Sequence, residues 1–220
     1  MGRCLVYQEM KTAVIVSGQM RTLDKTAKQL RSIYPDAFWV VHAHHDEDAD
    51  KAFILNPNIC IIEKQPELPE RREYAYQIGR GCPSIQGQLR QMWANLRAWQ
   101  IYKKSGHEAD FIVRMRPDLV FEVLPEAPAN DGIYFPKFAN YWGLNDRFAF
   151  GSKDLMEKYM TRLLNFDEYI DRGGIFHMET YMGYVFKDVE VKRTNAVFHS
   201  LRKDGSLDRA VSKKEWGDIC

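Results

Sequence analysis

The chain lacks a strong net charge and a long apolar run. Its 31 lysines and arginines balance 30 acidic residues, so the net charge is +1 and the basic footprint of a nucleic-acid binder is missing. No apolar run approaches the roughly 18 residues needed to span a bilayer, and the first residues hold too short an apolar stretch for a signal peptide. We therefore expect a cytoplasmic protein with no transmembrane segment and no nucleic-acid partner.

The chain also lacks closely spaced cysteines. Its four cysteines form no C-x-x-C pair, which argues against a zinc ribbon, and they give no disulfide framework. A length of 220 residues is enough for one domain with a buried core. We assign residues 1–200 to a single domain and residues 201–220 to a charged C-terminal tail.

Apolar strand-like runs alternate with amphipathic helical patterns in the first half of the chain. This order predicts β-α-β units and a three-layer α/β sandwich around a mostly parallel sheet, with a site beyond the carboxyl ends of the first strands. Residues 64–83, rich in Pro, Glu, Arg and Gly, are predicted to form a mobile loop. The predicted strands are 12–18, 37–43, 58–63, 109–121 (interrupted by Pro117), 132–136, 147–151, 189–193 and 196–200. The predicted helices begin near residue 23, after Ser84, after Ser152 and near residue 178.

The sequence H-A-H-H-D-E at residues 42–47 follows the second predicted strand. It nearly matches the H-x-H-x-D-H loop of metallo-β-lactamase-like hydrolases, which points to a metal-dependent hydrolase using His42, His44 and Asp46. Glu47 stands where that motif has its last histidine. The other interpretation is a strand end whose side chains meet water.

The sequence R-M-R-P-D-L-V-F at residues 114–121 places two arginines on one face of a strand. Arg114 and Arg116 need acidic partners or a phosphate-bearing ligand, because a buried unpaired charge is costly. Pro117 interrupts the hydrogen-bond ladder and exposes Asp118 at the carboxyl end of the strand, where a cation or another ligand can bind.

The order of these motifs resembles that of GT-A glycosyltransferases. A strand leads into S-G-Q-M-R, a second strand into an acidic loop, and a long helix precedes F-I-V-R-M-R-P-D-L-V-F. More narrowly, the chain is similar to short bacterial and viral glycosyltransferase-like proteins with an R-x-R-P-D-L strand. The resemblance extends from about Thr12 to His199. It implies a GT-A-like fold, a nucleoside-diphosphate-sugar donor, a glycan or other hydroxyl acceptor, and Mn²⁺ or Mg²⁺.

The resemblance also implies roles for particular residues. Asp118 and His199 would bind the metal ion, Glu179 would be the general base, and Asp146 would lie near a sugar. An arginine near the site would compensate the charge of the leaving diphosphate, and Arg116 is a candidate for this. Residues expected to receive the nucleotide diphosphate are Ser17, Gly18 and Arg21.

One residue departs from this pattern. Arg116 occupies the place of the first acid of the family's D-x-D motif, so one metal ligand is missing. A third interpretation, a non-catalytic module that binds a nucleotide-sugar or a glycan, therefore stays open beside the transferase and the hydrolase. Glu179 is also typical of an acid at a helix N-terminus, and His199 of a histidine at a strand end. Tyr141 and Trp142 are candidates for stacking on a sugar or a base.

Overall fold

The computed structural model describes residues 10–76, 84–126 and 131–208, and its centre is a seven-stranded sheet. The strand order is β3-β2-β1-β4-β7-β6-β8, and β7 runs against the other strands. The predicted α/β fold with a mostly parallel sheet is therefore confirmed. The strands are β1 (Thr12–Gly18), β2 (Phe38–His44), β3 (Ile59–Glu63), β4 (Phe111–Met115), β6 (Ile133–Pro136), β7 (Phe148–Ser152) and β8 (Val191–Thr194).

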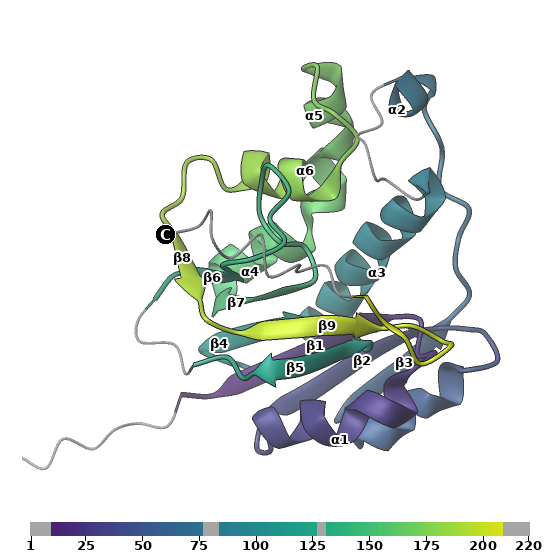
Figure 1. Cartoon of the computed structure of the whole chain (residues 1–220), viewed down its shortest axis with the longest axis vertical. Coiled ribbons are helices and arrows are strands. Elements are labelled where there is room, and N and C mark those ends of the chain that lie inside the picture. The colour runs from purple at the N-terminus through teal and green to yellow at the C-terminus, as the bar shows by residue number, and fades with distance from the viewer. Residues whose placement is uncertain (1–9, 77–83, 127–130, 209–220) are drawn as a thin grey trace, which may run out of the picture.

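Helices cover both faces of this sheet, because its central strands are apolar on both sides. In β1, Val14 and Val16 pack on one face, while Ala13 and Ile15 pack on the other. Helices α1 and α3 lie on opposite sides of the sheet in Figure 1. The first face is covered by α1 (Leu23–Ile33) and η1 (Ala49–Leu55), and the second by α3 (Ile85–Lys104), α4 (Lys153–Met160) and α6 (Met178–Val185).

The helix starts expected from the sequence are confirmed. Ser84 is the N-cap of α3, and its hydroxyl oxygen accepts a hydrogen bond from the Gly87 amide at 3.1 Å. Ser152 is the N-cap of α4, although its side chain makes no capping hydrogen bond. His177 is the N-cap of α6. Its backbone lies in the β region, and its side chain accepts a hydrogen bond from the Thr180 amide.

A second, three-stranded sheet was not expected. Its strands are β5 (Leu119–Val123), β9 (Val197–Leu201) and β10 (Leu207–Asp208), and both pairings are antiparallel. The prediction of one strand over residues 109–121 is therefore wrong, because Pro117 lacks an amide donor and the chain changes sheet there. The strand predicted at residues 196–200 also belongs to this second sheet, as β9, and not to the mostly parallel sheet. The boundary placed at residue 200 falls inside β9.

A third group of buried residues lies at the end of the molecule where α2, α5 and α6 meet (Figure 1). Tyr74 packs there against Phe166 and Phe176. The short elements at this end of the molecule are α2 (Arg72–Tyr76), η2 (Arg162–Asn165) and α5 (Phe166–Asp171). The mobile loop predicted for residues 64–83 thus contains a helical turn, and residues 77–83 lie outside the described part of the chain.

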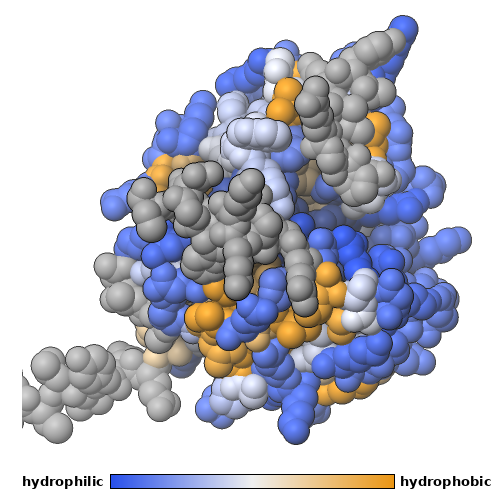
Figure 2. Space-filling view, in the orientation of Figure 1, coloured by the Kyte–Doolittle hydropathy of each residue, from blue (hydrophilic) through white to orange (hydrophobic). Residues whose placement is uncertain are grey.

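The surface of the face seen in Figure 2 is mostly hydrophilic, with apolar atoms gathered where β5 and β9 lie in Figure 1. Val123 and Leu124, at the end of β5, are about half exposed. Right of the centre of this face the surface is hollowed, and hydrophilic residues are visible there (Figure 2). Among the described helices, none is long and apolar enough to cross a membrane.

Candidate functional site

Two adjoining pockets open beyond the carboxyl ends of the parallel strands. The first has a volume of about 300 Å³ and is called the basic pocket here, and the second, of about 590 Å³, is called the carboxylate pocket. This is the edge of an open α/β sheet at which ligands bind. Residues that line both pockets are Gly87, Gln91, Arg116 and Arg202.

The basic pocket takes its name from the charges that line it. Of the described residues in its wall, six are basic and Asp118 is the one carboxylate. Gly18, the last residue of β1, adopts φ +123°, which side chains rarely tolerate, and so allows the chain to turn at the pocket wall. The basic residues are Arg21, Arg90, Arg114, Arg116, Arg202 and Lys203.

Arg114 lies fully buried at the floor of the basic pocket. Its Nε donates to the Asn95 amide oxygen at 3.1 Å, and its Nη1 donates to the Asp146 carbonyl at 2.6 Å. The Ser17 hydroxyl donates to the same Asn95 oxygen at 2.7 Å. The Nη2 of Arg114 has no hydrogen-bond partner within the described residues. Burial lowers the pKa of Arg114, whose neighbours include a second buried arginine, Arg162.

Arg116 and Asp118 form a bidentate pair across Pro117. The Arg116 Nε lies 2.9 Å from Oδ1 of Asp118, and Nη2 lies 2.6 Å from Oδ2. Burial alone raises the pKa of Asp118, but the facing guanidinium reverses this and the net direction is downward. In the same way the carboxylate raises the pKa of Arg116 despite its burial. The turn is held by the Thr26 hydroxyl, which donates to the Pro117 carbonyl at 2.6 Å.

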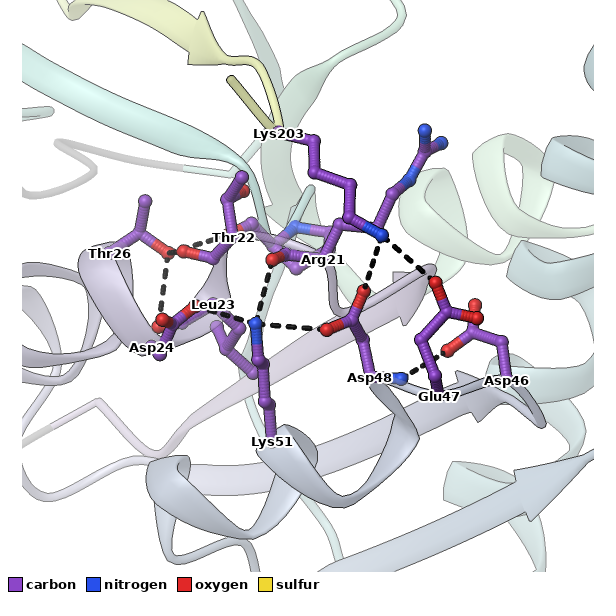
Figure 3. A network of polar contacts seen from close by, with 11 residues as sticks. Arg21, Thr22, Leu23, Asp24, Thr26, Asp46, Glu47, Asp48, Lys51 and Lys203 are labelled. Carbon is purple, nitrogen blue, oxygen red and sulfur yellow. Dashed lines mark hydrogen bonds and ion pairs between the residues drawn. The ribbon is translucent and has the colours of Figure 1, made fainter. Parts of the chain in front are cut away.

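Ion pairs between distant segments tie the rim of the basic pocket together (Figure 3). Lys203, in the β9–β10 turn, lies 2.9 Å from Glu47 and 3.8 Å from Asp48. Lys51 lies 3.0 Å from Asp48 and donates a hydrogen bond to the Arg21 carbonyl at 2.9 Å. The loop after β2 therefore holds both the turn that follows β1 and the β9–β10 turn.

The carboxylate pocket contains two acids that lie close enough to affect each other. Burial, followed by the charge of Asp146, raises the pKa of Glu179 to about 7. The Asp146 side chain accepts a hydrogen bond from the Gln91 amide at 2.8 Å. His177 Nε2 lies 3.5 Å from the Glu179 carboxylate, and burial lowers the pKa of this histidine. A carboxylate whose pKa is near 7 can accept a proton at neutral pH.

A tight loop presents an exposed aromatic ring at the carboxylate pocket. Trp142 and Tyr141 adopt positive φ values of 65° and 36°, and both line this pocket. The Trp142 side chain is 80% exposed, and its ring lies 5.9 Å from that of His177. Gly143 follows, and a Cβ there would lie 1.7 Å from the Glu179 carbonyl oxygen. Only glycine therefore lets this loop approach the first turn of α6.

The residues predicted to form the site fall into three sets. Ser17, Gly18, Arg21, Arg116 and Asp118 line the basic pocket. There the Ser17 hydroxyl donates a hydrogen bond to the Asn95 side-chain oxygen, which also accepts one from Arg114. Asp146 and Glu179 line the carboxylate pocket, where Arg116 also appears. His199 lines neither pocket.

His199 and Asp118 come from adjacent strand ends, but the structure does not bring their side chains to one point. The Leu201 amide donates to the Asp118 carbonyl at 2.8 Å, so the two strand ends lie side by side. His199 Nε2 contacts Glu122 at 2.8 Å. Ser200, which lines the carboxylate pocket, points from the opposite face of β9.

A divalent cation does not fit these donors well. Both oxygens of Asp118 already accept from Arg116, and a cation placed between them would meet a guanidinium. The described residues contain no group of three or more His, Cys, Asp or Glu side chains that could hold a metal ion. Binding of Mn²⁺ or Mg²⁺ by Asp118 and His199 stays a prediction.

Two of the three histidines of residues 42–47, His42 and His44, are buried, whereas His45 is exposed. His42 is fully buried and lies 3.2 Å from Glu63, and its ring meets the ring of Trp93 edge-on at 5.3 Å. His44 contacts the Gln65 amide. Burial lowers the pKa of both, to about 4 for His44. The carboxylate of Asp46 instead accepts from the Asp48 amide within its own loop.

Sequence reasoning missed several residues that line the pockets. Arg90 and Gln91 lie on α3 nearly two turns after Ser84. Arg202 and Lys203 were assigned to a charged tail. The Asp204-Gly205 pair is a hairpin signal that predicts the β9–β10 turn, and Gly205 has φ +85° there.

No family model matches the chain, and no curated protein matches its sequence. Many solved structures resemble it distantly, among them three that each match over 83% of this chain. One is a glycosyltransferase involved in the glycosylation of the major capsid of PBCV-1, at 12% identity and TM-score 0.43 over 79% of that chain. The other two are structures of the glycosyltransferase GlyE of Streptococcus pneumoniae TIGR4. The apo form has 10% identity and a TM-score of 0.44, and the second structure has 10% identity and a TM-score of 0.41. This chain covers 44% and 45% of those two GlyE chains.

Proposed function

We propose that the protein is a glycosyltransferase with a GT-A-like fold, which moves a sugar from a nucleoside-diphosphate donor to an acceptor hydroxyl. The observation that carries this proposal is the pair of adjoining pockets with opposite character and a shared wall. Such a transfer needs a cationic place for the leaving diphosphate and a carboxylate for the attacking hydroxyl. The basic pocket suits the first and the carboxylate pocket the second.

The shared wall suggests how the donor lies. A nucleoside diphosphate in the basic pocket would extend across the ends of β1 and β2, where Gly18 and His44 line the wall. Its terminal phosphate would approach Arg116, and the sugar beyond it would enter the carboxylate pocket. There Glu179 is the candidate general base, because its raised pKa allows it to take the proton of an acceptor hydroxyl at neutral pH.

The acceptor half of the pocket suits a glycan. Trp142 offers an exposed ring face beside His177 and Glu179, and flat apolar faces of sugars stack on such rings. Asp146, held by Gln91 and with its backbone carbonyl bonded to Arg114 and Tyr159, is placed to contact the donor or acceptor sugar.

A thermal-shift screen of nucleoside diphosphates and their sugars tests the proposal. A ligand that binds only the folded protein raises the melting temperature. We expect at least one nucleotide-sugar to do so, and to be hydrolysed or transferred more than tenfold faster by the native protein than by Glu179→Gln. Failure of every nucleotide and nucleotide-sugar to raise the melting temperature would overturn the proposal. Binding without turnover would favour a non-catalytic nucleotide-sugar-binding module instead.

A further inference from the structure

Arg116 and Asp118 take the places of the two acids that would hold a divalent ion in a D-x-D site, so the local charge is reversed at one of them. Asp118 retains a carboxylate, but both of its oxygens are committed to Arg116. A divalent ion at this carboxylate would lie beside the guanidinium and would be repelled by it, because like charges at close range interact unfavourably. The pair therefore disfavours a metal ion at this point.

At the floor of the basic pocket lies an arginine that forms no salt bridge with any acid of the described residues. Arg114 is fully buried, and its hydrogen bonds go to the Asn95 amide, the Asp146 carbonyl and the Tyr159 hydroxyl. None of the salt bridges among the described residues involves Arg114 or the neighbouring buried Arg162. A buried guanidinium without a carboxylate is costly to the fold, and an anion bound above it would offset that cost.

The rim adds cations that reach the pocket from three other segments. Arg21 follows β1, Arg90 lies on α3, and Arg202 lies in the turn after β9. Arg90 and Arg202 pair with Glu67 and Asp208, which remain partly exposed. No ion pair to Arg21 occurs within the described chain, where its side chain contacts Gln19. Arginine forks suit phosphate oxygens, which accept two parallel hydrogen bonds.

We propose that this protein binds the donor diphosphate without a divalent cation, with Arg116 at the place where the metal ion would otherwise compensate the leaving group. This inference rests on the proposed function. Arg116 lines both pockets, so its guanidinium lies where a bond between a sugar and a diphosphate would break. Asp118 orients that guanidinium, while Arg114 supplies a fixed charge beneath it. Arg21 and Arg202 hold the remaining phosphate oxygens.

Calorimetric titration with inorganic pyrophosphate tests this inference, once in EDTA and once in excess Mg²⁺, with the affinity corrected for the pyrophosphate that Mg²⁺ itself binds. We expect the native protein to bind pyrophosphate in EDTA at least as tightly as in Mg²⁺. Arg116→Ala should weaken binding in EDTA by tenfold or more, and Arg116→Lys by less. Arg172→Ala is the matched control, because this exposed arginine lines neither pocket and should bind pyrophosphate like the native protein.

A reversed variant makes the test sharper. Arg116→Asp rebuilds the missing acid and releases Asp118, so it should lose pyrophosphate binding in EDTA and regain part of it in Mg²⁺. Circular dichroism and a thermal melt check that each variant is folded, and Arg21→Ala serves as a further variant because that side chain is exposed.

The outcomes separate this inference from the function beneath it. Binding of pyrophosphate to the native protein in Mg²⁺ but not in EDTA would overturn the metal-free inference and leave the diphosphate site in place. Unchanged affinity in a folded Arg116→Ala would also overturn it. Absence of binding in both buffers would count against the basic pocket as a diphosphate site, and so against the proposed function.

Discussion

Arg116 and Asp118, separated by a single proline, form a bidentate salt bridge in which both carboxylate oxygens lie within 2.9 Å of a guanidinium nitrogen. The two side chains are only modestly accessible, at 28% and 18% exposure, so the pair is more than a surface contact. Its effect is to fix the direction of the arginine and to withdraw the carboxylate from other ligands. Both Asp118 oxygens therefore already accept hydrogen bonds from Arg116, two residues earlier.

Replacing Asp118 gives a result that distinguishes the two kinds of site. Asp118→Asn keeps the size of the side chain but removes the charge that neutralises Arg116. We expect pyrophosphate affinity in EDTA to stay within about threefold of the native value or to rise, while the free energy of unfolding falls by about 1 kcal/mol because a charged hydrogen-bond pair is lost. Titration calorimetry and urea unfolding measure the two quantities. A tenfold loss of pyrophosphate affinity in Mg²⁺ but not in EDTA, in a folded Asp118→Asn, would instead indicate that its carboxylate holds a cation.

Much of the fold could be predicted from local pattern. The continuous apolar run of β1 and the apolar face of α3 indicate their type, because a strand buried on both faces and an amphipathic helix each leave a distinct periodicity. Pro117 was recognised as a break. That the chain would then enter a second sheet depends on pairing between β5 and β9, which are far apart in the sequence and carry no local signal of each other.

The site was predicted less completely, for reasons of register and of contact. His199 and Ser200 are neighbours in the sequence. Ser200 lines the carboxylate pocket, whereas His199 contacts Glu122. Alternation along a strand decides this, and a shift of one residue reverses it. Gln91 is polar on an amphipathic helix, and only the tertiary fold shows that it bonds to Asp146 rather than to water.

The pH dependence of transfer should follow the ionisation of Glu179. Burial and the charge of Asp146 raise its pKa to about 7, so the base is increasingly available as the pH rises through that value. We expect a rising limb in kcat with an apparent pKa near 7. In Glu179→Gln we expect kcat to fall by about 10²–10⁴-fold and the limb to disappear, while donor affinity is retained.

Other groups that face Glu179 are Asp146, Arg147, Arg116 and His177. His177→Asn is the informative control, because asparagine can still cap α6 and cannot titrate in this range. The rising limb should persist in this variant. Its disappearance there, or its survival in Glu179→Gln, would assign the limb to another group.

The same ionisation should cost the protein stability. The carboxyl of Glu179 has a folded-state pKa of about 7, against 4.5 for an ordinary glutamate, so ionisation is harder in the folded state. Stability is therefore full below about pH 4.5 and declines as the pH rises toward 7. Glu179→Gln should then be more stable than the native protein by on the order of 3 kcal/mol at pH 8, and by little at pH 4, because one pKa unit corresponds to about 1.4 kcal/mol.

Urea unfolding at the two pH values measures this difference. Glu190→Gln is the control, since it removes an exposed acid that lines neither pocket and should change stability by less than about 0.5 kcal/mol at both. Equal stability of native protein and Glu179→Gln at pH 8 would show that Glu179 ionises without strain, and would remove the basis for a pH limb near 7.

Trp142 should act on the acceptor and not on the donor. Its ring is 80% exposed, so Trp142→Ala gives up little buried area and should change the free energy of unfolding by less than about 0.5 kcal/mol. If a sugar of the acceptor stacks on the ring, its loss should raise the acceptor KM about tenfold, the equivalent of about 1.4 kcal/mol. Hydrolysis of the donor, in which water is the acceptor, should be unchanged, and Trp142→Phe should restore part of the affinity.

Leu164→Ala, which removes an apolar side chain that is 68% exposed and lines neither pocket, should leave both reactions as they are. A fall in donor hydrolysis equal to the fall in transfer would place the ring against the donor, because an acceptor contact cannot affect a reaction that lacks the acceptor.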